Sequence, residues 1–240
     1  MLPERIFILT GAGISAESGL GTFRDEDGLW TQVNLEDVAS IDGYIRDPKL
    51  VLDFYNMRRR NLRDARPNAA HEAVAALQRA WSEAGGSVFV CTQNVDDLHE
   101  RGGAEDVVHM HGELTKARCE ACAAVFAWTE DLDVDTACPL CAARGFVRPH
   151  IVWFGEMPFE MERIYEELVL ADLFVAIGTS GAVYPAAGFV AEARRAGTPT
   201  LEINLAPSDT ADAFDDARYG RATETVPAWV RSLLVGEEDD

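Results

Sequence analysis

Lysine is scarce in this chain, and positive charge is scarce with it. Lys49 and Lys116 are the only lysines, and 41 acidic residues stand against 21 lysines and arginines, for a formal net charge of −20 at pH 7. Such a field repels nucleic acid and anionic membrane surfaces, so we expect neither as a partner. It suits basic, lysine-bearing partners, although a well-solvated surface or a saline habitat would explain the same charge.

Long apolar runs are missing as well. No run approaches the ~20 residues that a membrane-spanning helix needs. The apolar run at residues 6–10 is too short for the core of a signal peptide, and no basic segment leads into a longer one. These absences predict a cytoplasmic protein. A monomer is the working expectation, although the sequence does not determine the oligomeric state.

The alternation of predicted strands and helices indicates an α/β fold with one doubly wound parallel sheet. Hydrophobic residues make up 48% of the 240 residues, which excludes a disordered chain. Strands are predicted at residues 6–10, 87–92, 173–178 and 200–204. Helices are predicted after the N-cap Asn68, at residues 159–170 and 185–195, and near the C-terminus with Pro227 in the first turn.

Two stretches interrupt this alternation. Residues 35–65 read as a polar helical insert, and residues 117–148 hold four cysteines with little periodicity. We therefore divide the chain into a Rossmann-like domain (residues 1–34, 66–116 and 149–240), the helical insert and a small metal-binding module.

A glycine-rich loop follows the first strand. Gly11-Ala12-Gly13-Ile14-Ser15-Ala16 should open a helix, which is the context that a dinucleotide-binding loop requires. Alone the loop is weak evidence, because a simple tight turn has the same composition. The acidic residue that dehydrogenases carry roughly 20 residues later is absent, since a polar loop stands there with no strand before it. A bound nucleotide is therefore held differently from a hydride carrier.

Four cysteines form two C-x-x-C pairs with a metal-site spacing. Cys119 and Cys122, then Cys138 and Cys141, predict a tetrathiolate zinc site, and a disulfide pairing is the weaker alternative in a cytoplasmic protein. Four thiolates fill a tetrahedral shell and leave no position for water or substrate, so the zinc is structural. The fifth cysteine, Cys91, lies within a predicted strand and is assigned to the core.

Taken together, these segments resemble the sirtuin family along essentially the whole chain. The motifs that carry the resemblance are Gly11-Ala-Gly-Ile-Ser-Ala-Glu-Ser-Gly19 with Thr22-Phe-Arg24, Thr92-Gln-Asn-Val-Asp96, His109-Met-His-Gly112, the two cysteine pairs, Gly178-Thr-Ser180 and Asn204. The resemblance implies an NAD-dependent protein-lysine deacylase whose NAD and acyl-lysine peptide meet between a Rossmann-like domain and a zinc module. NAD is consumed there, and the products are nicotinamide, O-acyl-ADP-ribose and free lysine.

The resemblance also assigns roles to single residues. His111, which precedes Gly112 in the His-Gly motif, is implied as the general base, while His71, His99, His109 and His150 are taken as structural. Asn94 and Asp96 are implied to orient the nicotinamide ribose and carboxamide. The remaining residues implied to bind NAD are Gly11, Ala12, Gly13, Ser15, Phe23, Arg24, Gln93, Gly178, Thr179, Ser180 and Asn204. The residues implied to pair with the substrate backbone are Phe154, Gly155, Val183 and Tyr184.

A tyrosine and an arginine in the helical insert bear on the acyl group. Tyr55 and Arg58 are spaced i and i+3 and so share a helix face. The pair resembles that of class III sirtuins, which remove succinyl, malonyl or glutaryl groups, and Ala39 matches the small residue that leaves room for a longer acyl chain. The alternative is an Arg58 paired with Asp53 or Asp64 on a solvated face. Relatives with this pair are expected to retain deacetylase activity.

Three other functions remain open at this stage. ADP-ribosyl transfer to a protein uses the same cofactor and differs only in its products. A hydride-transferring dehydrogenase is disfavoured by the missing ribose acid. A zinc-ribbon module that binds nucleic acid is disfavoured by the acidic residues around the cysteines.

Overall fold

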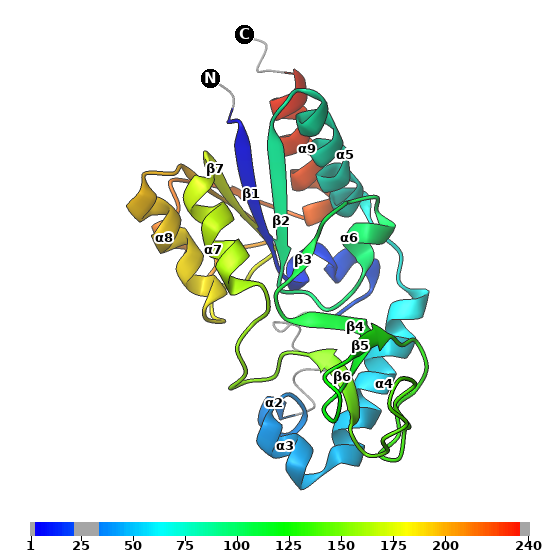
Figure 1. The fold of residues 1–240 in the computed structure, drawn as a ribbon. Helices are drawn as coiled ribbons and strands as arrows, with labels where there is room; N and C mark the ends of the chain where they lie inside the picture. Colours follow the sequence, from blue (N-terminus) through cyan, green and yellow to red (C-terminus); the bar gives the residue numbers. More distant parts are fainter. Residues whose placement is uncertain (1–2, 22–33, 236–240) are drawn as a thin grey trace.

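The structure is a computed structural model that describes residues 3–21 and 34–235. It has two parts, a large parallel sheet covered by helices and a smaller antiparallel sheet with helices beside it (Figure 1). The predicted Rossmann-like α/β class, with a small cysteine-bearing module and a helical insert, is confirmed.

The large sheet has the strand order β3-β2-β1-β7-β8-β9, and every pairing in it is parallel. Its strands are β1 (Arg5–Thr10), β2 (Ser87–Thr92), β3 (Val108–His109), β7 (Leu173–Ile177), β8 (Thr200–Asn204) and β9 (Asp216–Tyr219). Along the chain, β1, β2 and β3 are added outward on one side of the sheet, and β7, β8 and β9 are added outward on the other, so the direction of strand order reverses between β1 and β7. Ligands of open α/β sheets bind at such a reversal, outside the carboxyl ends of the strands.

Side chains alternate between two hydrophobic clusters, one on each face of this sheet. Ile6 and Ile8 point into the cluster under α5 (Ala69–Glu83) and α9 (Ala222–Val235). Phe7 and Leu9 point into the cluster under α7 (Met161–Leu170) and α8 (Phe189–Ala196). Burial on both faces explains why the central strands read as continuous apolar runs.

Most predicted elements are confirmed, but two predictions are wrong: the start of α9 and the helix expected at the glycine loop. Asn68 caps α5 as predicted, accepting from the Ala70 N–H at 2.9 Å. Pro227 is not in the first turn of α9, which begins five residues earlier. A tertiary contact sets that start, because the Glu17 carboxylate accepts hydrogen bonds from the Thr223 N–H and hydroxyl at 3.0 and 2.9 Å.

The glycine loop does not open an α-helix among the described residues. It forms two single 3₁₀ turns, Ala12–Ile14 and Ala16–Ser18, and Gly19 ends the second with φ of +85°. In the large sheet, the strands β3 and β9 were not predicted. Both are short and lie at the edges of the sheet, where little apolar patterning is needed.

The helical insert comprises α2 (Leu35–Val38), α3 (Ile41–Arg46) and α4 (Pro48–Asp64). Helix α4 packs on the small sheet, with β5-β4-β6 as its strand order, formed by β4 (Gly112–Cys119), β5 (Val125–Ala127) and β6 (Val147–Ile151). Asn56 of α4 exchanges two 2.8 Å hydrogen bonds with the backbone of Leu132, and Arg59 Nε donates to the Leu114 carbonyl at 2.8 Å. These buried bonds join the insert to β4 and to the cysteine-bearing segment.

A short helix, α6 (Leu98–Arg101), connects β2 to β3. Among the described residues, none of the helices has both the length and the apolar composition needed to cross a membrane.

Candidate active site

The carboxyl ends of β1, β2, β7 and β8 open into a cleft with a volume of about 940 Å³. Every site residue predicted from the sequence that the structure describes, apart from the four cysteines, lies on its wall. These residues are Gly11, Ala12, Gly13, Ser15, Ala39, Tyr55, Arg58, Gln93, Asn94, Asp96, His111, Phe154, Gly155, Gly178, Thr179, Ser180, Val183, Tyr184 and Asn204. Phe23 and Arg24 lie outside the described residues.

Two glycine turns meet backbone to backbone at the floor of the cleft. The Gly11 N–H donates to the Ile177 carbonyl at 3.0 Å, and the Gly13 N–H donates to the Gly178 carbonyl at 2.9 Å. A Cβ at Gly13 would lie 2.7 Å from Gly178 Cα, and a Cβ at Gly11 would lie 2.8 Å from the Gly178 oxygen. Only glycine permits this approach, which holds the loop after β1 against the end of β7.

A buried polar cluster surrounds Asn94 and Asp96. The Asn94 amide nitrogen donates to the Gly11 carbonyl (3.1 Å) and to Ser15 Oγ (3.2 Å), so its Oδ1 is the atom left to accept from a ligand. Asp96 accepts from the Ser15 hydroxyl at 3.1 Å and from the Leu98 N–H at 3.1 Å. Burial raises the pKa of Asp96, and these two hydrogen bonds oppose the rise.

The tautomer of His111 is set by the backbone. Its Nδ1 lies 3.1 Å from the Gln93 carbonyl, which can only accept, so Nδ1 carries the proton and Nε2 has the free lone pair. Burial lowers the pKa of His111, and the bond to Gln93 opposes this. The ring is therefore neutral near pH 7, as a general base must be.

The other four histidines make structural contacts. His71 Nδ1 accepts from the Asn68 N–H at 3.2 Å, His99 Nε2 lies 2.9 Å from the Thr10 hydroxyl, and His150 stacks on Phe159 with ring centroids 4.5 Å apart. His109 forms an ion pair with Glu100 at 2.7 Å. Burial works against the charged form of His109, but this pair prevails and raises its pKa.

Helix α4 places Tyr55 and Arg58 together on the cleft wall. The helix begins at Pro48, after the Asp47 carboxylate accepts from the Leu50 N–H at 2.9 Å. The Arg58 guanidinium carbon lies 5.9 Å from the centre of the Tyr55 ring. Across the cleft rim, the Phe154 N–H donates to the Ala39 carbonyl at 2.8 Å, which ties the insert to the segment after β6.

At the other end of the cleft, Asn204 Nδ2 donates to the Thr179 carbonyl at 2.7 Å and the Ser180 hydroxyl accepts from the Ala182 N–H at 3.2 Å. Among the wall residues that the sequence analysis missed are Asn61, Trp153 and Arg221. Asn61 follows Arg58 at i+3, so the helix spacing could have found it. Arg221 follows the unpredicted strand β9, and no sequence signal marks it.

The four cysteines of the small module form a zinc-type site. All four sulfurs lie within 4.8 Å of one another, and the pairs Cys119–Cys141 and Cys122–Cys138 are 3.8 Å apart. Zinc–sulfur bonds of about 2.3 Å in a tetrahedron require sulfurs about 3.8 Å apart, whereas a disulfide requires about 2.05 Å. The donor set fits zinc and excludes a disulfide. Cys91 is buried in the large sheet, as predicted.

Comparison with known proteins agrees with this geometry. The Sir2 family model matches residues 11–185. The chain is 60% identical to an NAD-dependent protein deacylase of Caulobacter vibrioides, over 96% of this chain and 97% of that one. It is 52% identical to an NAD-dependent protein deacylase of Escherichia coli K12, over 98% and 84% of the two chains.

Solved structures extend the comparison to ligands. A Sir2 homologue in complex with NAD superposes with a TM-score of 0.87 at 36% identity, covering 96% of this chain and 90% of that one. A Sir2 protein with a deacetylated p53 peptide and 3′-O-acetyl ADP-ribose superposes with a TM-score of 0.80 at 27% identity, covering 98% and 94%. With a cleft built from these motifs, a four-cysteine zinc site and relatives of this similarity, the chain belongs to the Sir2 (sirtuin) family and is an NAD-dependent protein deacylase of the bacterial type.

Proposed function

We propose that this deacylase prefers acyl-lysines whose acyl chain ends in a carboxylate, such as succinyl-lysine and malonyl-lysine, with acetyl-lysine as a second substrate. The observation that carries the proposal is the joint position of Tyr55 and Arg58 on the cleft wall. A guanidinium binds a carboxylate through two parallel hydrogen bonds, and a phenol can add a third. The small side chain of Ala39, also on the wall, leaves room for the longer chain.

The surroundings of Arg58 favour an anion. Burial lowers the pKa of Arg58, while Tyr55 and Asp96 nearby act in the opposite direction, so the guanidinium lies in a largely desolvated wall. A charge in such a wall attracts a carboxylate more strongly than a solvated charge would. The alternative pairing with Asp53 is disfavoured, because Asp53 forms an ion pair with Lys49 at 2.5 Å.

For the chemical step we propose the roles that the family motifs imply. NAD, when bound, supplies the bond between nicotinamide and ribose that is broken in deacylation. His111 Nε2 accepts a proton from a ribose hydroxyl, because its Nδ1 is committed to the Gln93 carbonyl. Asn94 Oδ1 accepts a hydrogen bond from a ligand hydroxyl, since both hydrogens of the Asn94 amide are donated within the protein. Asp96, held by Ser15, orients the carboxamide.

The same proposal places the peptide and the adenosine at opposite ends of the cleft. Phe154 and Tyr184 are 53% and 76% exposed at the rim, so large apolar surfaces are available to flank an extended peptide that pairs with this segment. Gly155 and Val183 lie beside them on the wall. Thr179 and Ser180 follow β7 and Asn204 ends β8, at the edge of the sheet where the adenosine half would bind.

The test compares Arg58→Met with Arg60→Met, a control on the exposed side of the same helix, where Arg60 pairs with Asp131. Products from acetyl, succinyl and malonyl peptides with NAD are quantified by mass spectrometry. Loss of a charge-assisted contact should lower kcat/KM for the acidic acyl peptides by roughly 10- to 100-fold in Arg58→Met, and far less for acetyl. Equal losses for all three peptides would refute the acyl preference. ADP-ribosylated protein without O-acyl-ADP-ribose would favour the transferase alternative.

A further inference from the structure

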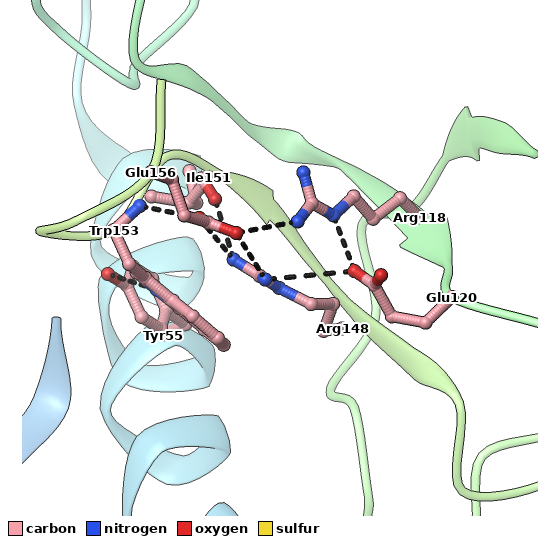
Figure 2. A network of polar contacts seen from close by, with 7 residues as sticks. All are labelled: Tyr55, Arg118, Glu120, Arg148, Ile151, Trp153 and Glu156. Carbon is pink, nitrogen blue, oxygen red and sulfur yellow. Dashed lines mark hydrogen bonds and ion pairs between the residues drawn. The ribbon is translucent and has the colours of Figure 1, made fainter. Parts of the chain in front are cut away.

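Tyr55 receives a hydrogen bond from a buried tryptophan. Trp153, which follows β6 and is 2% exposed, donates from its indole Nε1 to the Tyr55 oxygen at 3.0 Å (Figure 2). An indole N–H has no acceptor capacity, so the direction of this bond is fixed. The Tyr55 oxygen is the acceptor, and its own proton is left for another partner.

That proton is available to the cleft. Within the described residues, the bond from Trp153 is the one hydrogen bond that this hydroxyl makes, and Tyr55 lines the cleft. Burial raises the pKa of Tyr55, against the smaller opposing effects of Arg58 and Trp153, so the phenol keeps its proton at neutral pH. Tyr55 therefore meets a ligand as a hydrogen-bond donor.

The indole is itself held by an ion-pair network. The Arg148 guanidinium lies 3.3 Å from the centre of the Trp153 ring, and its two terminal nitrogens donate to the Glu156 carboxylate at 2.8 and 2.9 Å (Figure 2). Glu156 also accepts from the Trp153 N–H and from Arg118, each at 2.8 Å. The ring is thus fixed on its face and at its backbone.

This network begins in the zinc module. Arg118 on β4 directly precedes the zinc ligand Cys119, and Arg148 on β6 pairs with Arg118 in register. The two strands that carry the arginines are the ones that the cysteine-bearing segment connects. The order of contacts therefore runs from the zinc module through Glu156 and Trp153 to Tyr55.

We propose that Trp153 is a positioning residue for acidic acyl groups: its indole N–H occupies the acceptor side of the Tyr55 hydroxyl and directs the Tyr55 proton at a carboxylate in the cleft. The inference rests on the proposed acyl preference. It adds that the direction of the Tyr55 hydroxyl is set by another wall residue, through a hydrogen bond that does not involve the acyl group. An acetyl group has no terminal acceptor and gains nothing from this arrangement.

The test removes the indole N–H and keeps the ring. In Trp153→Phe, kcat/KM for succinyl and malonyl peptides should fall about fivefold to tenfold, mainly through KM, while acetyl changes by no more than about twofold. The matched control is Trp128→Phe, because the buried Trp128 Nε1 has no hydrogen-bond partner among the described residues. Its succinyl-to-acetyl ratio should stay at the wild-type value. If Trp153→Phe folds poorly, 3-benzothienylalanine at this position, with sulfur in place of N–H, gives the same readout.

A double-mutant cycle with Tyr55→Phe separates positioning from packing. Once the Tyr55 hydroxyl is gone, replacing Trp153 should cause no further selective loss. The inference would be overturned if replacing Trp153 lowered kcat/KM for the acidic acyl peptides equally with and without the Tyr55 hydroxyl. It would also be overturned if Trp153→Phe affected acidic and acetyl peptides alike while Arg58→Met affected only the acidic ones. If Arg58→Met and Tyr55→Phe are both unselective, the acyl preference fails and the inference falls with it.

Discussion

Replacing Gly178 by alanine should damage both stability and NAD binding. Gly178 has φ of +63°, in the left-handed region, and a Cβ there would lie 2.5 Å from the Ile14 nitrogen and 2.7 Å from the Gly13 carbonyl carbon. Both neighbours are backbone atoms, so no flexible side chain can move away. The alanine must displace one of the two glycine turns that form the floor of the cleft.

The magnitude follows from a matched comparison with Gly197→Ala. Gly197 has φ of +81° but nothing within 4 Å of its would-be Cβ, so that variant loses only about 1–2 kcal/mol for the left-handed backbone. Gly178→Ala has the same backbone cost and a further overpacking cost of about 1–3 kcal/mol. For a chain of this length each kcal/mol lowers Tm by roughly 2–4 °C.

The assay is urea unfolding of both variants, with NAD affinity measured by calorimetry. Gly197→Ala should bind NAD as the wild type does, whereas Gly178→Ala should be the less stable variant and should bind NAD several-fold more weakly. Equal stability and equal NAD affinity of the two variants would refute the reasoning, because they share the backbone strain and differ only in the close contact.

Three further predictions concern the base, the buried histidine and the metal. His111→Tyr should abolish deacylation while zinc content and fold are kept, and retained activity would mean that another group is the base. Because burial lowers the pKa of His111 below its usual 6.5, wild-type kcat/KM should fall as the pH drops through that lowered pKa. Burial lowers the pKa of His71 to about 4. Its contribution to stability is therefore full above about pH 6.5 and is lost as the pH falls towards 4, which lowers the free energy of unfolding by about 3 kcal/mol at most. In urea unfolding, His71→Gln should show a flatter dependence of stability on pH over that range. One zinc should bind per chain, Cys138→Ser should lose it and unfold the small sheet, and Cys91→Ala should retain it in a colorimetric release assay.

The elements that local pattern predicts well are those whose burial is uniform. Strand β8 was predicted at its observed bounds, because Thr-Leu-Glu-Ile-Asn follows the turn residues Gly197 and Pro199, and four of these five residues are buried. The start of α9 was not predictable in this way, since a carboxylate more than 200 residues away caps its first turn. Strand β9 carries mostly exposed side chains and so lacks the alternation that marks a half-buried strand.

The sequence by itself determined the chemistry that this protein carries. The glycine loop and the spacing of four cysteines predict a nucleotide and zinc, because each depends on residues close together in the chain, and the resemblance of the ordered motifs to the sirtuin family implies deacylation. Only the tertiary structure decided how those groups are directed. The tautomer of His111 depends on a carbonyl 18 residues away, and the donor direction of Tyr55 depends on an indole 98 residues away. Such bonds join segments that only packing brings into contact, so the local sequence around Tyr55 does not predict its bond to Trp153.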